Sequence, residues 1–180
     1  MDREREMIIN AKKHINQFDY LYSKYYPKIN NFVYHRVKEE SVRNEIVSNV
    51  FFKAMKRLSI FRFYDSRNSG FSSWLYRIAL SELSQYFYER KREKRIHDNF
   101  EWNLPVGKPI EIDYSILEKF QADLKPNEQN LITLRFYEKL SYAEIGEILK
   151  KKEGTVKVQT HRILKKLREK IEKEIDNERS

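Results

Sequence analysis

The sequence contains no cysteine and few residues that make turns. The absence of cysteine among 180 residues excludes disulfide bonds and thiolate metal sites. Glycine and proline occur 4 times each, too rarely for the many tight turns of an all-β fold. The four histidines are scattered, and neither a metal-binding His spacing nor a glycine-rich phosphate loop occurs. We therefore expect an all-α protein that is not an enzyme and needs no metal or cofactor.

Long apolar runs are also absent. No run approaches the roughly 20 residues that a membrane-spanning helix needs. The first ten residues, MDREREMIIN, are charged where a signal peptide would be apolar. The sequence therefore predicts a cytoplasmic protein without membrane insertion.

What is abundant is positive charge. The formal net charge is +9 and the sequence pI is about 9.5. Such an excess indicates a polyanionic partner, most often nucleic acid, although an anionic membrane surface gives the same signal. Hydrophobic residues make up 40% of the chain and aromatic residues 14%, enough to bury a core.

Helical periodicity divides the chain into two parts. Apolar residues recur every three or four positions over residues 3–37, with Pro27 expected to break or kink the helix, and over 41–58 and 71–95. Residues 62–70 carry turn residues and are expected to form a loop. We predict two small helical domains, 1–96 and 114–180, joined by the flexible linker 97–113, which contains two prolines and a glycine.

The second domain contains a helix-turn-helix pattern. Helices are expected at 114–124 and 127–137, the latter opened by Pro126. The segment SYAEIGEILKKKEGTVKVQTHR, residues 141–162, then predicts a helix, a short turn and a helix. Ser141 and Glu144 have the spacing of a capping box, and Thr155 is expected to cap the second helix.

The second helix of this pattern has two faces. Its inward stripe is predicted from helical spacing: Val156, Thr160, Ile163, Leu164, Leu167 and Ile171. The other face is basic and polar, which suits either solvent or the major groove of DNA. The helix-turn-helix context favours DNA. Gln159 can pair with adenine and Arg162 with guanine, each through two hydrogen bonds.

Both halves resemble a known family. Residues 124–169, LKPNEQNLITLRFYEKLSYAEIGEILKKKEGTVKVQTHRILKKLRE, resemble the C-terminal promoter-recognition domain of a bacterial sigma factor of the sigma-70 family. FDYLYSKYYPKINNF (18–32), EIVSNVFFKAMKRL (45–58) and GFSSWLYRIALSELSQYF (70–87) resemble the other conserved sigma domain, in the expected order. The resemblance is closest to the extracytoplasmic-function (ECF) group.

This resemblance implies a transcription initiation factor whose partners are core RNA polymerase and promoter DNA. The helix 41–58 would dock on the clamp helices of the β′ subunit, and the C-terminal domain on the β flap. The implied polymerase contacts are Glu45, Ser48, Asn49 and Lys53. Val47, Val50 and Phe51 fit either that interface or the domain's own core, and we favour the core.

The resemblance also implies that each domain binds one promoter element. The loop 62–70 and the helix after it would open the −10 duplex and hold a flipped base, because stacking rings and polar edges suit an extruded base. The implied −10 residues are Phe63, Tyr64, Ser66, Asn68, Ser72, Ser73, Arg77, Ser81 and Gln85. The implied −35 residues are Thr155, Lys157, Val158, Gln159, His161, Arg162 and Lys165.

Two alternatives remain at this point. A stand-alone helix-turn-helix regulator would share the C-terminal domain but bind duplex DNA without polymerase. Alternatively, a sigma factor whose DNA recognition is weakened at Ser48, Asn49, Ser81, Val158 and Gln159 would be recruited by another DNA-targeting partner, including an RNA-guided one. ECF sigma factors are commonly held inactive by an anti-sigma factor, so such a factor is a further expected partner.

Overall fold

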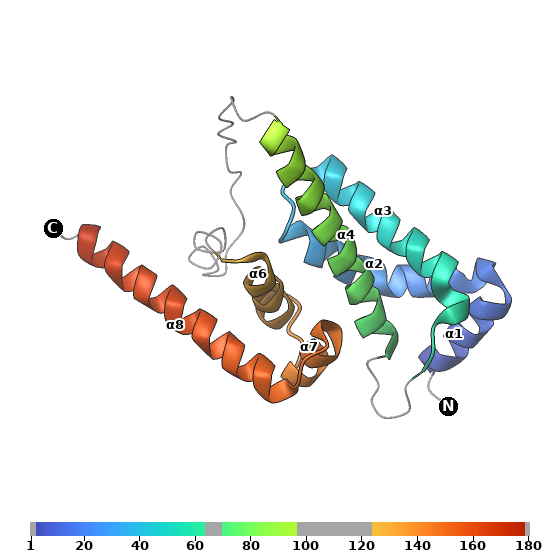
Figure 1. Cartoon of the computed structure of the whole chain (residues 1–180). Helices are drawn as coiled ribbons and strands as arrows, with labels where there is room; N and C mark the ends of the chain where they lie inside the picture. The colour runs from blue at the N-terminus through green and yellow to red at the C-terminus, as the bar shows by residue number, and fades with distance from the viewer. Residues whose placement is uncertain (1–2, 64–69, 97–123, 179–180) are drawn as a thin grey trace.

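The computed structural model describes residues 3–63, 70–96 and 124–178, which are largely helical and contain no strand in these ranges (Figure 1). The expected linker and nearly all of the expected helix 114–124 lie outside the described residues. The all-α prediction is confirmed.

The first expected helix is divided in two, at a different place from the one predicted. The chain forms α1 (Arg3–Lys13), a short 3-10 turn η1 (Ile15–Phe18) and α2 (Asp19–Tyr34). The break falls at His14, whose backbone is extended, whereas Pro27 lies inside α2. The prediction of a break at Pro27 was wrong because buried Tyr25 and Ile29 anchor α2 on both sides of the proline and offset its lost hydrogen bond.

Three helices form the core of the N-terminal half. α3 (Glu40–Arg57) is followed by the 3-10 turn η2 (Leu58–Ile60) and, later, by α4 (Gly70–Ile96). In Figure 1, α3 and α4 run side by side and α2 crosses them. Val47, Val50 and Phe51 are buried in this core, so the preference for a core role is confirmed.

The C-terminal half begins as predicted. Pro126 opens α6 (Pro126–Ile132), which continues as one π-helical turn, η3 (Thr133–Tyr137), instead of the single helix expected over 127–137. α7 (Tyr142–Leu149) follows. Its capping box is confirmed: the Glu144 amide donates to Ser141 Oγ at 3.2 Å, and the Ser141 amide donates to Glu144 Oε2 at 2.7 Å.

The turn between α7 and α8 (Glu153–Glu178) contains residues 150–152, whereas the sequence predicts a turn over KKKEG, residues 150–154. Lys150 ends α7 with a left-handed backbone, φ 54°, and the Val156 amide already donates to the Lys152 carbonyl at 3.1 Å. Thr155 therefore lies in the first turn of α8, and the prediction that it caps this helix was wrong. The Lys151 amide donates to the Gly146 carbonyl at 2.8 Å, which folds the turn tightly against α7.

The two halves pack directly on one another. α7 and η3 lie against α4 and α2. Tyr76 Oη donates to Glu138 Oε2 at 2.6 Å, and Asn31 Nδ2 donates to Glu138 Oε1 at 2.7 Å. The rings of His35 and Tyr137 stack with centroids 3.8 Å apart. The joint is therefore made of hydrogen bonds and one stacked ring pair.

Gly146→Ala is expected to destabilise the helix-turn-helix. An added Cβ would lie 2.7 Å from the Lys151 carbonyl oxygen, which is backbone and cannot rotate away. The expected loss in the free energy of unfolding is roughly 1–3 kcal/mol. Gly154→Ala is the matched control, since nothing lies within 4 Å of its added Cβ, and its stability should be unchanged or slightly raised. Denaturant unfolding of both variants measures this, and equal effects would contradict the role of Gly146.

His35 is expected to make the joint sensitive to acid. Burial, and secondarily Lys38, lowers the pKa of His35 from 6.5 to about 4. Because the folded pKa lies below the unfolded one, the stabilisation is present above pH 6.5 and is lost as the pH falls toward 4. His35→Phe keeps a ring against Tyr137 but cannot gain a proton.

Thermal unfolding across this pH range should therefore show a smaller acid loss for His35→Phe than for the wild type. Glu138, whose pKa is raised by burial, contributes with the opposite sign in both proteins and cancels in the comparison. His14→Gln serves as the control, because His14 is an exposed histidine at the N-terminal end of η1. An identical acid loss in His35→Phe and the wild type would contradict the assignment.

Candidate nucleic-acid and polymerase interfaces

The outer face of α8 presents the predicted −35 residues to solvent. Six of them are exposed: Thr155, Lys157, Val158, His161, Arg162 and Lys165. Val158 is 51% exposed although it is apolar, as a methyl contact to a base would require. Gln159 is half-buried at the edge of this face. The structure thus brings together on one side of one helix the groups that the sequence predicted.

The inner face of α8 is fixed to α6 and α7. Val156, Ile163 and Leu167 are buried, and buried Thr160 donates from Oγ1 to the Val156 carbonyl at 2.9 Å. Leu164 is 39% exposed, so its predicted place in the inward stripe was wrong. It lines a shallow groove on α8 with His161 and Arg168. The buried stripe sets which side of α8 faces outward.

Several internal contacts bear on this face. Lys165 Nζ lies 3.9 Å from Glu169 Oε1, both exposed. Lys151 Nζ donates to Gln159 Oε1 at 2.9 Å, so pairing of Gln159 with adenine requires that Lys151 release the amide oxygen. Lys157 pairs with Glu153 at 2.9 Å, but both side chains are largely exposed. Such exposed pairs contribute little, and Lys157 remains available to a phosphate.

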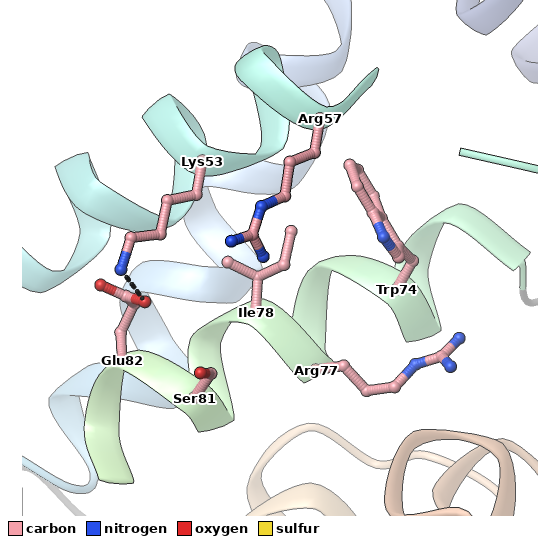
Figure 2. A pocket seen from close by; sticks show the side chains of 7 residues that line it. All are labelled: Lys53, Arg57, Trp74, Arg77, Ile78, Ser81 and Glu82. Carbon is pink, nitrogen blue, oxygen red and sulfur yellow. Dashed lines mark hydrogen bonds and ion pairs between the residues drawn. The ribbon is translucent and has the colours of Figure 1, made fainter. Parts of the chain in front are cut away.

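A second candidate surface is a hollow between α3 and α4, about 220 Å³ in volume (Figure 2). It is lined by Lys53, Arg57, Trp74, Arg77, Ile78, Ser81 and Glu82. Lys53 Nζ pairs with Glu82 at 2.6 Å, and Glu82 is buried. Neither Arg57 nor Arg77 has a carboxylate partner among the described residues. Arg77 Nε donates to the Ser73 carbonyl at 3.2 Å. Two cations without an ion pair, an indole and a hydroxyl are the groups that bind single-stranded nucleic acid.

The predicted −10 residues are divided by the structure. Arg77 and Ser81 line the hollow, and exposed Gln85 donates to Glu89 at 3.0 Å. Ser72 is half-buried, whereas Ser73 is 2% exposed and donates to Glu147 of α7 at 3.4 Å. Ser73 is therefore covered while the two halves are packed together.

The remaining −10 candidates lie in the segment between α3 and α4. Phe63 is half-buried, with its ring beneath the Arg5 guanidinium at 5.0 Å. Tyr64, Ser66 and Asn68 lie outside the described residues.

The four predicted polymerase contacts lie on one face of α3, mostly three or four residues apart, but they border two different depressions. Ser48 lines an open groove between α2 and α3, whereas Lys53 lines the hollow between α3 and α4. Glu45 is exposed and Asn49 is half-buried between these two edges. Lys53 is also held by Glu82, so it is the least available of the four.

The groove beside Ser48 contains exposed apolar side chains that the sequence prediction missed. Phe52 is 49% exposed and Tyr22 is 43% exposed, and Met55 lies beside them. Lys56 Nζ lies 4.4 Å from the centroid of the Phe52 ring. The sequence contained a signal for this surface. Phe51 and Phe52 are consecutive residues of one helix and point in different directions, so only one of them can face the domain core.

The described residues contain no helix long and apolar enough to cross a membrane. They also contain no group of three or more His, Cys, Asp or Glu side chains placed to hold a metal ion.

Two family models match the chain, one to each half. The model of Sigma-70 region 2 matches residues 21–93, and that of Sigma-70, region 4 matches residues 122–169. The first match contains α2, α3 and nearly all of α4, with the hollow and the groove. The second contains the helix-turn-helix and the exposed face of α8.

Curated relatives match both halves together. "ECF RNA polymerase sigma factor BldN" of Streptomyces coelicolor is 26% identical over 83% of this chain, and the match spans 58% of that relative's length. "RNA polymerase sigma factor YlaC" of Bacillus subtilis is 26% identical over 93% of this chain and 99% of the relative. "ECF RNA polymerase sigma-E factor" of Haemophilus influenzae is 29% identical over 86% and 87%.

Solved structures share the fold. CnrH, solved in complex with the cytosolic domain of CnrY, has a TM-score of 0.69 at 17% identity, covering 95% of this chain and 98% of that one. The sigma factor RpoE of Bartonella quintana, solved with the anti-sigma factor NepR, has a TM-score of 0.68 at 20% identity, covering 86% and 96%.

Arg162→Ala is expected to weaken recognition of one upstream base pair. Loss of a two-bond contact to guanine should cost roughly 1–3 kcal/mol of discrimination at that position. The measurement is binding to a library of duplexes, compared with Arg168→Ala, an exposed arginine farther along α8. An equal loss on every sequence would instead identify Arg162 as a phosphate contact.

Proposed function

Because the chain belongs to the sigma-70 family of RNA polymerase sigma factors, we propose that it is an ECF-type initiation factor which binds core polymerase and directs it to promoters in the cytoplasm. The observation that carries this proposal is the presence on one chain of two surfaces with groups suited to nucleic acid. One is the exposed face of α8, suited to duplex DNA, and the other is the basic and aromatic hollow between α3 and α4. A stand-alone regulator would use the first surface and leave the second without a role.

The groove between α2 and α3 is the proposed polymerase contact. Its centre is apolar, with Tyr22, Phe52 and Met55, and Ser48 and Asn44 supply polar groups at its rim. Such a surface suits a helical partner, because the centres of protein interfaces are aromatic and their rims polar. We assign the β′ clamp helices to this groove, and Glu45 and Asn49 to the adjoining face of α3.

The hollow is the proposed site for the opened −10 strand. Trp74 offers a ring for stacking, Ser81 a hydrogen-bonding group, and Arg57 and Arg77 two charges for phosphates. Opening of the duplex is favoured when the separated strand gains contacts that the duplex lacks. The polymerase carries out RNA synthesis, and this chain selects where it starts.

Binding to both promoter elements requires that the two halves separate. Positions −35 and −10 are about 25 base pairs apart, roughly 85 Å along B-DNA at about 3.4 Å per base pair. α7 and α4 are in contact, so their faces cannot reach both elements at once. We assign the packed arrangement to the free factor. An anti-sigma factor is a further proposed partner, since RpoE of Bartonella quintana was solved with one.

The test of this proposal is co-elution of the purified chain with bacterial core RNA polymerase. The wild type should co-elute stoichiometrically, and Phe52→Ala should lose affinity by more than about 1 kcal/mol, because its ring fills the centre of the groove. Tyr88→Ala removes an even more exposed ring, 68% against 49% for Phe52, from α4 outside the groove, and should co-elute like the wild type. A wild-type chain that stays free of core yet shifts duplex DNA would instead be a stand-alone regulator.

A further inference from the structure

Helix α1 carries a basic face that neither promoter surface includes. Arg5 and Lys12 stand seven residues apart, on the same side of α1. Both lie over aromatic rings of the segment that follows η2. The Arg5 guanidinium is 5.0 Å from the centroid of Phe63, and Lys12 Nζ is 5.6 Å from that of Phe61 and 5.8 Å from that of Phe63. Lys12 Nζ also donates to the Phe61 carbonyl.

A third cation completes this cluster. Arg62, exposed between the two phenylalanines, is close enough to contribute to lowering the pKa of Lys12, second to the burial of Lys12 itself. No carboxylate pairs with Arg5, Lys12 or Arg62 among the described residues. Of the two acidic residues in the first turn of α1, Glu4 is engaged by Lys24 and Tyr25, and exposed Glu6 makes no ion pair with the three cations. Three cations are therefore held close together without an ion-pair partner among the described residues, at an electrostatic cost that a bound anion would remove.

The cluster lies next to the hollow between α3 and α4. The buried Phe61 ring lies 5.2 Å from the Trp74 ring, and Trp74 lines the hollow. In Figure 1, α1 lies beside the chain that leads from α3 toward α4. Basic side chains therefore stand on both sides of Trp74 and Phe61: Arg57 and Arg77 at the hollow, and Lys12, Arg62 and Arg5 beside α1. A row of cations with an accessible ring such as that of Trp74 is how proteins hold the backbone and bases of single strands.

We propose that Arg5, Lys12 and Arg62 form an additional binding site for the phosphates of single-stranded DNA, extending the hollow onto α1. The ligand is the phosphodiester backbone of the opened strand. That such a strand is present rests on the proposed function. The site holds no base-specific group, so it strengthens binding uniformly across sequences. Its role is to retain the strand once it has been separated.

The test uses the full chain and a short fluorescein-labelled oligothymidine, with fluorescence anisotropy at several salt concentrations. Arg5→Gln/Arg62→Gln removes two charges but spares Lys12, whose bond to the Phe61 carbonyl has a structural role. The slope of log affinity against log salt should become shallower by about 1.4, from two phosphates at about 0.7 each. Arg5→Lys/Arg62→Lys keeps the charges and should restore the slope.

Lys13→Gln/Lys173→Gln removes two exposed charges away from the cluster and is the matched control. An equal loss in the control, or no binding of oligothymidine by the wild type, would overturn the site. A loss of the same size on a duplex would overturn its assignment to single strands. Co-elution with core is measured on the same preparations. The two proposals can fail separately. If the chain co-elutes with core but the Arg5 and Arg62 variant binds oligothymidine as the control does, the proposed function stands and the α1 site is overturned.

Discussion

One carboxylate, that of Glu138, joins the two halves of this protein. It accepts hydrogen bonds from Tyr76 of α4 and Asn31 of α2. Burial raises its pKa, and these two bonds partly oppose that rise because they favour the charged form. The Tyr76 ring is fixed in turn by an edge contact with Phe32, centroids 5.4 Å apart. The orientation of the helix-turn-helix on the N-terminal half therefore depends on a partly buried polar contact.

Polar contacts between the two halves accompany their apolar packing. Hydrogen bonds join Glu138 with Tyr76 and Asn31, Ser73 with Glu147, and Arg36 with Gln129. Water can replace hydrogen bonds of this kind when the halves part, but it cannot replace an apolar core. Polar interfaces between domains accordingly allow relative motion. In this arrangement the joint covers Ser73 of α4, which separation of the halves would expose.

The sequence was sufficient for the features that periodicity and capping control. The exposed set on α8 follows from the stripe of Val156, Ile163 and Leu167, and the start of α7 follows from Ser141 and Glu144. The place where the first helix breaks could not be predicted, because packing of Tyr25 and Ile29 outweighs the local preference of Pro27. The pairing of Lys53 with Glu82 could not be predicted either. This pair joins α3 to α4 and occupies a residue that was predicted to contact the polymerase. Such contacts depend on tertiary placement, to which local sequence patterns carry no signal.

The cations behind the net charge of +9 divide into those that form ion pairs within the fold and those that do not. Lys24 with Glu4, Lys53 with Glu82 and Lys166 with Glu128 are used within the fold. The cations without a carboxylate partner among the described residues include Arg162 on α8, Arg57 and Arg77 at the hollow, and Arg5 and Arg62 beside α1. On α8, Lys157 and Lys165 also lie near carboxylates, Glu153 at 2.9 Å and Glu169 at 3.9 Å, but such exposed pairs contribute little. The cations without a carboxylate partner that are named above lie on the faces proposed to bind DNA. A polyanion bound there would supply the negative charge that these cations lack within the fold.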